Sequence, residues 1–214
     1  MGGLGLADLG SAGPVLALLA ILSLISVAVI VARAMALAGV AGGADGRDSA
    51  LAALEAGQID AAGSALGDAA PADRVARRAV ELVGLGAAPA AVEADLTGLG
   101  NAEVAAMGRG LRLLDLVGMV APLLGLLGTV LGMIQSFRSL ELAAGSANAS
   151  ILAGGIWQAL LTTAAGLLVA IPALAGASYL ASRIEAGTLQ IERVITRAGV
   201  AAARGGGSSA GGAR

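Results

Sequence analysis

Two stretches, APLLGLLGTVLGMIQSF (Ala121–Phe137) and GIWQALLTTAAGLLVAIPAL (Gly155–Leu174), decide the fold of this 214-residue chain. Each is an uncharged apolar run interrupted by glycine, threonine and proline, with few of the aromatic side chains that fill soluble cores. At about 1.5 Å of rise per residue, a helix of about 20 residues crosses the roughly 30 Å hydrocarbon layer of a bilayer. Small residues also let helices approach closely in lipid. The two stretches therefore predict packed transmembrane helices.

Working outward, gaps in the charge pattern mark three spans. The chain is 57% hydrophobic, 13% charged and 1% aromatic, whereas soluble domains carry about 25% charged residues. The gaps predict an all-α integral membrane protein with three transmembrane helices, a helical cytoplasmic linker and helices that extend into the cytoplasm. The predicted spans are Val15–Val31, Leu116–Phe137 and Ile151–Ser182, with a loop at Leu142–Ser150.

The first span has an alternative interpretation as a cleaved signal peptide, because ARAMALAG (Ala32–Gly39) supplies small residues after the apolar run. No Arg or Lys precedes that run, and it is longer than a usual signal core. Both features favour a span that is retained.

The arginines predict the orientation. Residues 33–112 hold seven arginines and residues 183–214 hold five, whereas the loop between the second and third spans has only Arg138. Because basic residues accumulate on the cytoplasmic side of a membrane, we expect a periplasmic N-terminus and a cytoplasmic linker and tail.

The linker is predicted to be helical. Asp48 and Ser49 are expected to cap a short helix, Pro71 to open one that ends at Gly84, and Pro89 to open another. The stretch at 101–115 is expected to run as a helix into the second span, and GGGSSAGGAR (Gly205–Arg214) to be a flexible tail. This organisation divides the chain into 1–36 (N-terminus and first span), 37–111 (linker), 112–182 (second and third spans) and 183–214 (helix extension and tail).

The residue inventory excludes several functions. The chain has no Cys and no His, and all 13 of its basic residues are Arg. Thiol chemistry, imidazole acid–base catalysis, lysine Schiff bases and most metal sites are thereby removed. We expect no enzyme, cofactor or metal site, and the absence of a basic stripe argues against nucleic acid as a partner.

Small and polar residues form narrow faces on the second and third spans. One face contains Thr129, Gly132 and Ser136, and the other contains Thr163 and Gly166 among alanines. We predict helix packing for glycines and prolines, and polar support for three further residues. The packing residues are Gly125, Gly128, Gly132, Gly166, Pro122 and Pro172, and the supporting residues are Gln158, Thr162 and Ser136. A membrane threonine taken alone is more often structural, because it bonds a carbonyl one turn back.

No Asp, Glu, Lys, Arg or His lies inside the three predicted spans. A membrane proton or cation relay usually contains an ionisable side chain. If this protein conducts ions, the titrating group must therefore come from another chain.

Together the two opening stretches resemble the second and third spans of the MotA/TolQ/ExbB proton channel family, and the three-span topology is similar to its ExbB/TolQ branch. The resemblance is dense from about Arg112 to Leu174 and weak in the linker. It implies a homopentamer around a one-span ExbD- or TolR-type partner that carries a membrane aspartate. It further implies work driven by the proton-motive force in the bacterial inner membrane, for TonB-dependent import through a TonB- or TolA-type protein or for envelope maintenance.

The resemblance also assigns roles to single residues. Thr129 and Thr163 match the two threonines that line the ion path in this family, and Pro122 and Pro172 match helix-shaping prolines. Gln158 is a departure, because many members carry Glu at this position, and a role that requires titration there is lost.

Other functional hypotheses stay open at this point. A structural membrane scaffold with the same packing and no ion path is the alternative. A solute carrier is disfavoured, because the spans contain no internal repeat and no charged substrate site.

Overall fold

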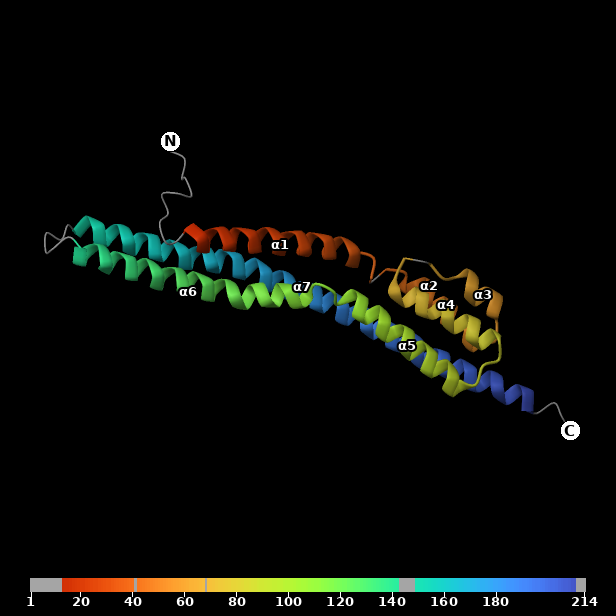
Figure 1. Cartoon of the computed structure of the whole chain (residues 1–214). Coiled ribbons are helices and arrows are strands. Elements are labelled where there is room, and N and C mark those ends of the chain that lie inside the picture. The colour runs from red at the N-terminus through yellow and green to blue at the C-terminus, as the bar shows by residue number, and fades with distance from the viewer. Residues whose placement is uncertain (1–12, 41, 68, 143–148, 211–214) are drawn as a thin grey trace. The chain divides into compact units, whose positions relative to one another are not determined.

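A computed structural model describes residues 13–40, 42–67, 69–142 and 149–210, and these residues form helices connected by turns, with no strand among them. Figure 1 shows the helices in chain order. They are α1 (Gly13–Leu37), α2 (Ala44–Glu55), α3 (Ile59–Ser64), α4 (Pro71–Gly84), α5 (Pro89–Met107), α6 (Leu111–Leu142) and α7 (Ala149–Ala210). The prediction of an all-α chain is confirmed for this part of the sequence.

The chain divides into two compact units. Unit 1 contains the described residues up to Arg33 together with Gly110–Tyr179, and unit 2 contains Ala34–Arg109 and the described residues from Leu180 onward. Unit 1 therefore holds most of α1, α6 and the first part of α7. Unit 2 holds α2 to α5 and the remainder of α7.

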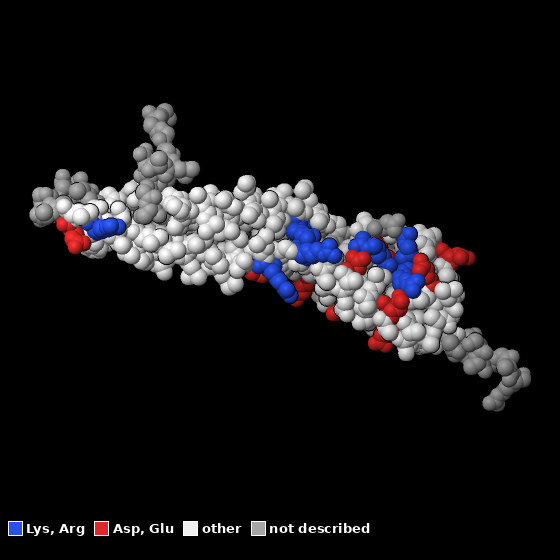
Figure 2. Space-filling model, viewed as in Figure 1, with Lys and Arg blue, Asp and Glu red and all other residues white. Residues whose placement is uncertain are grey.

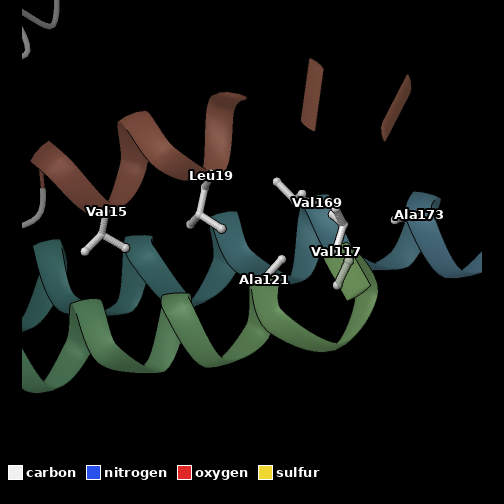
Figure 3. Close-up of a cluster of buried hydrophobic side chains, with 7 residues drawn as sticks. Val15, Leu19, Val117, Ala121, Val169 and Ala173 are labelled. Carbon is white, nitrogen blue, oxygen red and sulfur yellow. The ribbon is translucent and has the colours of Figure 1, made fainter. Parts of the chain in front are cut away.

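The core of unit 1 lies where α1 packs on α6 and α7. Val15 and Leu19 of α1 belong to one buried cluster with Val117 and Ala121 of α6 (Figure 3). Val169, Ala170 and Ala173 of α7 complete this cluster. Alanines supply much of the contact, so the helices approach closely without large side chains between them.

Three helical stretches among the described residues are long and apolar enough to cross a membrane, and they lie within Gly13–Leu37, Pro89–Leu142 and Leu152–Gly205. Unit 1 leaves large apolar side chains exposed, such as Leu123 at 63% and Leu168 at 73%. Figure 2 shows an uncharged surface over the spans of unit 1, and charged side chains over α2 to α5. Such a surface suits lipid or another apolar chain, and the three predicted spans are confirmed as transmembrane candidates.

Unit 2 is held by ion pairs. Arg47 and Asp73 are both buried, with 2.6 Å between Nη1 and Oδ1, and Arg47 also donates to the carbonyl of Gly42 and to the side chain of Gln190 on α7. The second Asp73 oxygen accepts a hydrogen bond from the backbone N–H of Ala70, which caps α4. The pair therefore joins α2, α4 and α7.

A partly exposed pair joins α4 and α5. Arg74 donates two hydrogen bonds to the Glu103 carboxylate, at 2.7 and 2.5 Å. These bonds lower the pKa of Glu103 below its usual value. On the same helices, hydrogen bonds from Arg78 lower the pKa of Asp95.

Three details of the linker and tail differ from the sequence prediction. Helix α2 begins at Ala44 after Gly43, whose φ is 73°, so the predicted cap of Asp48 and Ser49 is wrong and both residues lie inside the helix. The left-handed conformation that glycine adopts easily allows the chain to turn earlier than the predicted cap.

The predicted continuous helix from the linker into the second span is also wrong. Helix α5 ends at Met107, and Gly110, with φ of 87°, separates it from α6. A left-handed residue cannot continue a right-handed helix, so the two glycines at 108 and 110 act as a break.

The prediction that α7 continues beyond the third span is confirmed, and the helix reaches Ala210. Residues 205–210 therefore extend the helix instead of forming the predicted tail, because propagating an existing helix adds one bond per residue fixed. The last four residues and most of the predicted 142–150 loop (143–148) lie outside the described part of the chain.

Candidate functional site at the contact between two helices

The contact between α6 and α7 in unit 1, here called the seam, is made by residues with little or no side chain. A β-carbon added at Gly166 would lie 2.6 Å from the carbonyl oxygen of Ala121. One added at Gly125 would lie 2.8 Å from the carbonyl oxygen of Thr162. Real β-carbons do not approach this closely, so the two backbones meet directly only because both residues are glycine.

The seam continues toward the α6–α7 connection with the same pattern. A β-carbon on Gly132 would lie 3.3 Å from that of Ala159, and one on Gly155 would collide with the Ser136 side chain. The Ser136 hydroxyl is buried and donates to the Gly132 carbonyl at 2.8 Å. These pairings run in opposite directions along the two helices, so α6 and α7 are antiparallel.

Thr162 is the polar residue at the centre of the seam. Its side chain has 0% exposure and lies against Gly128, where an added β-carbon would come within 2.6 Å of the Thr162 hydroxyl oxygen. The hydroxyl is 2.7 Å from the Ala159 carbonyl of its own helix and 3.1 Å from the Gly125 carbonyl of α6. Its proton is therefore shared between the two helices.

Thr129 and Thr163 lie at the same level as Thr162 along the seam. Thr129 directly follows Gly128, the residue opposite Thr162, and Thr163 directly follows Thr162. In antiparallel helices with a rise of about 1.5 Å per residue, these two threonines are about 3 Å apart along the axis. Three hydroxyl side chains thus share one level of unit 1.

Thr129 and Thr163 also face the same side of the seam. One residue step turns a helix by about 100°, so residues that directly follow seam residues of two antiparallel helices point to a common side. Leu124 and Ala165, which directly precede seam residues, pack against the cluster containing α1. Thr129 and Thr163 therefore lie on the side away from α1, and each is half-buried.

The hydroxyls of these two threonines differ in their local bonds. Thr129 donates to the Leu126 carbonyl at 2.6 Å, one turn back on its own helix. Within the part of the chain that the structure describes, the Thr163 hydroxyl forms no hydrogen bond. Both can offer lone pairs to water or to a protonated carboxyl group, because a hydroxyl accepts as well as donates.

Gln158 does not join this group. It lies seven residues before Ala165, which is nearly two turns, so it occupies the same face as Ala165 and points toward the α1 side. Its side chain is half-buried. Of the three predicted supporting residues, Thr162 and Ser136 therefore lie in the seam, whereas Gln158 lies outside it.

The two prolines lie inside continuous helices. Pro122 is half-buried within α6, and Pro172 is exposed within α7. Each removes one backbone N–H from its helix, which membrane helices tolerate. Neither proline contributes a polar group to the level of the three threonines.

Sequence reasoning gave Thr162 too small a part. The sequence predicts Thr163 on the small face of α7 and Thr162 as polar support, whereas the seam is centred on Thr162. The signal was available in the sequence: Ala159, Thr162, Gly166 and Ala173 recur at three-, four- and seven-residue steps, and all four are buried. No group of three or more acidic, His or Cys side chains that could hold a metal ion occurs among the described residues.

One comparison with known proteins covers the whole seam region. A model of the MotA/TolQ/ExbB proton channel family matches residues 68–193, more than half of the chain. That range contains α4, α5, α6 and the seam-forming part of α7.

Curated relatives are similar over shorter ranges. The biopolymer transport protein exbB1 of Vibrio cholerae is 56% identical over 71 residues, which are 33% of this chain and 31% of that protein. A putative ExbB-like biopolymer transport protein of Synechocystis is 40% identical over 120 residues, 52% of this chain and 57% of that protein. The biopolymer transport protein ExbB of Salmonella typhimurium is 44% identical over 68 residues, 32% of this chain and 28% of that protein. Each alignment spans less than two thirds of the relative.

Proposed function

The chain belongs to the MotA/TolQ/ExbB proton channel family, and from this premise we propose that it is the channel-forming subunit of a proton-driven motor. In this proposal the subunit works with a one-span partner of the ExbD or TolR type and energises transport across the outer membrane or maintenance of the envelope. Its role is to conduct and to transmit force, without an enzymatic reaction.

The observation that carries the proposal is the level of hydroxyls described above. Thr129 and Thr163 lie about 3 Å apart along the axis and on the same side of the seam. The spans supply no Asp, Glu, Lys, Arg or His, so a proton that crosses beside them needs a titrating group from elsewhere. A partner carboxylate at this level would meet hydroxyls that orient it without titrating themselves.

The exposed apolar surface of unit 1 supports assembly into a homo-oligomer. Leu126 and Leu160 are 57% and 61% exposed close to the level of the threonines. In a ring of copies, some of this surface is covered by neighbours, and the rest faces lipid. We propose a pentamer, in which five copies of Thr129 and Thr163 surround the partner.

The three apolar spans and the family support a multi-pass location in the bacterial inner membrane, and the arginine distribution supports an N-terminus in the periplasm with the linker and C-terminus in the cytoplasm. An alkaline phosphatase fused at Gly145 is expected to be active, and fusions at Ala65 and Ser208 are expected to be silent. The reverse pattern would contradict the orientation.

The decisive experiment measures proton flux into liposomes. Three preparations are compared: this protein alone, the complex with its one-span partner, and the complex whose partner aspartate is changed to Asn. We expect flux only from the complex with the intact aspartate. Robust flux from the protein alone would overturn the proposal, and no flux from any preparation would favour a structural scaffold.

The same assay tests the two threonines. Thr129→Val and Thr163→Val keep the side-chain shape and remove the hydroxyl, and we expect each to reduce flux through the assembled complex. Thr196→Val is the matched control, because Thr196 lies in unit 2 and donates to the Glu192 carbonyl of its own helix. Flux that ignores both substitutions would remove these residues from the ion path.

Gln158 tests the departure from the family pattern. We expect Gln158→Glu to be tolerated and Gln158→Leu to be damaging, because leucine removes the half-buried amide and leaves its polar partner unpaired, at a cost of about 1–3 kcal/mol. Normal assembly and normal flux of the Leu variant would assign the position to packing alone.

A further inference from the structure

Thr162 is distinguished from the other two threonines by the partner of its hydroxyl. Thr129 donates to its own helix, whereas the Thr162 hydroxyl also reaches the Gly125 carbonyl on α6 at 3.1 Å. The side chain is fully buried in the space left by Gly128. A fully buried hydroxyl that bridges two backbones is a structural tie between the helices.

The tie lies directly beside the proposed ion path. Thr163 is the next residue after Thr162, and Thr129 is the next residue after Gly128, against which Thr162 packs. A rotation of α7 about its axis by one residue step, about 100°, would turn the Thr163 hydroxyl away from its present side. The orientation of both path threonines therefore depends on how α6 and α7 are joined at this level.

Small-residue contacts alone hold such an orientation weakly. Gly125, Gly128 and Gly166 offer smooth surfaces with no side chain to interlock. In lipid no hydrophobic effect drives the helices together, so close packing and interhelical hydrogen bonds must fix their arrangement. The Thr162 side chain provides both, because its methyl group and hydroxyl fill the space opposite Gly128 and its proton is shared with α6.

We propose that Thr162 is a positioning residue of the ion path: its hydroxyl bond to the Gly125 carbonyl holds α6 and α7 so that Thr129 and Thr163 face the partner carboxylate together. This inference rests on the proposed function. Thr162 itself is buried in the seam and makes no contact with the conducted ion in this proposal.

The test compares Thr162→Val, Thr162→Ala and Thr162→Ser in the complete complex with the one-span partner, reconstituted in liposomes. Val keeps the shape and removes the bond, Ala removes the bond without placing a methyl group against the Gly125 carbonyl, and Ser keeps the hydroxyl. Thr188→Val is the matched control on the same helix, because the Thr188 hydroxyl donates to the Ile184 carbonyl of its own helix. Proton flux is recorded against pH for each complex, and assembly is measured by size-exclusion chromatography.

We expect Thr162→Val to assemble and to reduce flux per complex by about three- to tenfold, the size expected for one interhelical hydrogen bond. The pH midpoint of the remaining flux should shift, because the partner carboxylate meets misplaced hydroxyls. Thr162→Ser should restore both the flux and the midpoint, and Thr188→Val should change neither. A residue that only stabilised the fold would lower the amount of complex and leave the midpoint unchanged.

An assembled Val variant with the wild-type midpoint would overturn the proposal. If Thr162→Val does not assemble, the flux and the pH midpoint of Thr162→Ala decide the test. Failure of both variants to assemble would show a folding role and would also overturn it. Absence of flux from the wild-type complex would overturn the proposed function and this inference together, whereas wild-type flux that is indifferent to Thr162 would overturn this inference alone.

Discussion

The two units of this protein are held together by opposite means. In unit 1, α6 and α7 touch through glycines at which no β-carbon fits, and the described residues of this unit form no ion pair. In unit 2, ion pairs join α2, α4, α5 and α7, and one of them is buried. Where lipid surrounds the helices, burial of apolar surface supplies no driving force between them and contact distance decides. The different chemistry of the units therefore indicates different surroundings.

The largest expected effect is a loss of stability in unit 2. Arg47→Met would leave the buried Asp73 carboxylate without its partner and should destabilise the unit by about 3–5 kcal/mol. Hydrogen exchange measured by mass spectrometry should show faster exchange in α2 and α4 and unchanged exchange at the seam. The double variant Arg47→Met/Asp73→Leu should recover much of the loss, because it removes both buried charges.

Arg78→Gln is the control for this experiment. Arg78 and Asp95 form an exposed pair on α4 and α5, with side chains 41% and 40% exposed. Exposed pairs contribute about 0–1 kcal/mol, so a loss as large as that of Arg47→Met would contradict the importance of burial.

The second largest expected effect is a loss of stability in unit 1. Gly166→Ala places a β-carbon against the Ala121 carbonyl and should destabilise α6–α7 packing by about 1–3 kcal/mol, measured as thermal unfolding in detergent. Gly154→Ala is the matched control on the same helix, because its β-carbon would meet nothing within 4 Å. Equal unfolding temperatures for the two variants would show that the seam is looser than described.

A smaller effect is expected at the start of α6. Gly110 has φ of 87°, a conformation that costs an L-residue about 1–2 kcal/mol, so Gly110→Ala should lower the thermal unfolding midpoint. Gly108→Ala should not, because Gly108 has φ of −72° and its β-carbon would make only ordinary contacts. A destabilising Gly108→Ala would place the helix break elsewhere.

The smallest effect concerns pH in unit 2. The hydrogen bonds from Arg74 lower the pKa of Glu103 in the folded state. Their contribution is therefore complete above the unfolded-state pKa of about 4.3 and is lost as the pH falls through the lower folded value. Wild type should exceed Glu103→Gln in stability at pH 7 by less than about 1 kcal/mol, since the pair is partly exposed.

In denaturant titrations that difference should shrink as the pH falls from the unfolded-state pKa of about 4.3, and it should vanish below the lower folded-state pKa, where the folded carboxylate becomes protonated. A stability difference that persists at low pH would be due to packing of the Glu103 side chain.

The spans were predictable because their signal is a long absence of charge. Uncharged runs of more than 20 residues leave few structures other than a membrane helix. The break between α5 and α6 was missed, since glycine is compatible with a helix as well as with a left-handed turn, and only the backbone angle of Gly110 distinguishes them. The early start of α2 was missed for the same reason at Gly43.

The types of residue in the candidate site were predictable from the sequence, whereas the helix face on which each one lies was less so. Glycine spacing indicated that α6 would pack closely, but a helix carries more than one small face, and the choice depends on the facing helix. Adjacent Thr162 and Thr163 differ by about 100° around α7, so only the pairing with Gly125 and Gly128 assigns one to the seam and the other to its side. Their proposed roles remain predictions.

The tightness of the seam also has an electrical consequence. A gap that cannot admit a β-carbon at Gly125 or Gly166 cannot admit a file of water molecules, so the α6–α7 pair of one subunit acts as an insulating wall. Without water or a titrating side chain between these helices, a proton has no route through the wall. In the proposed motor, permeation would then occur along the outer surface of this helix pair, where the partner chain would close the conduit, and the glycines that bring the helices together would also prevent leakage through an unassembled subunit.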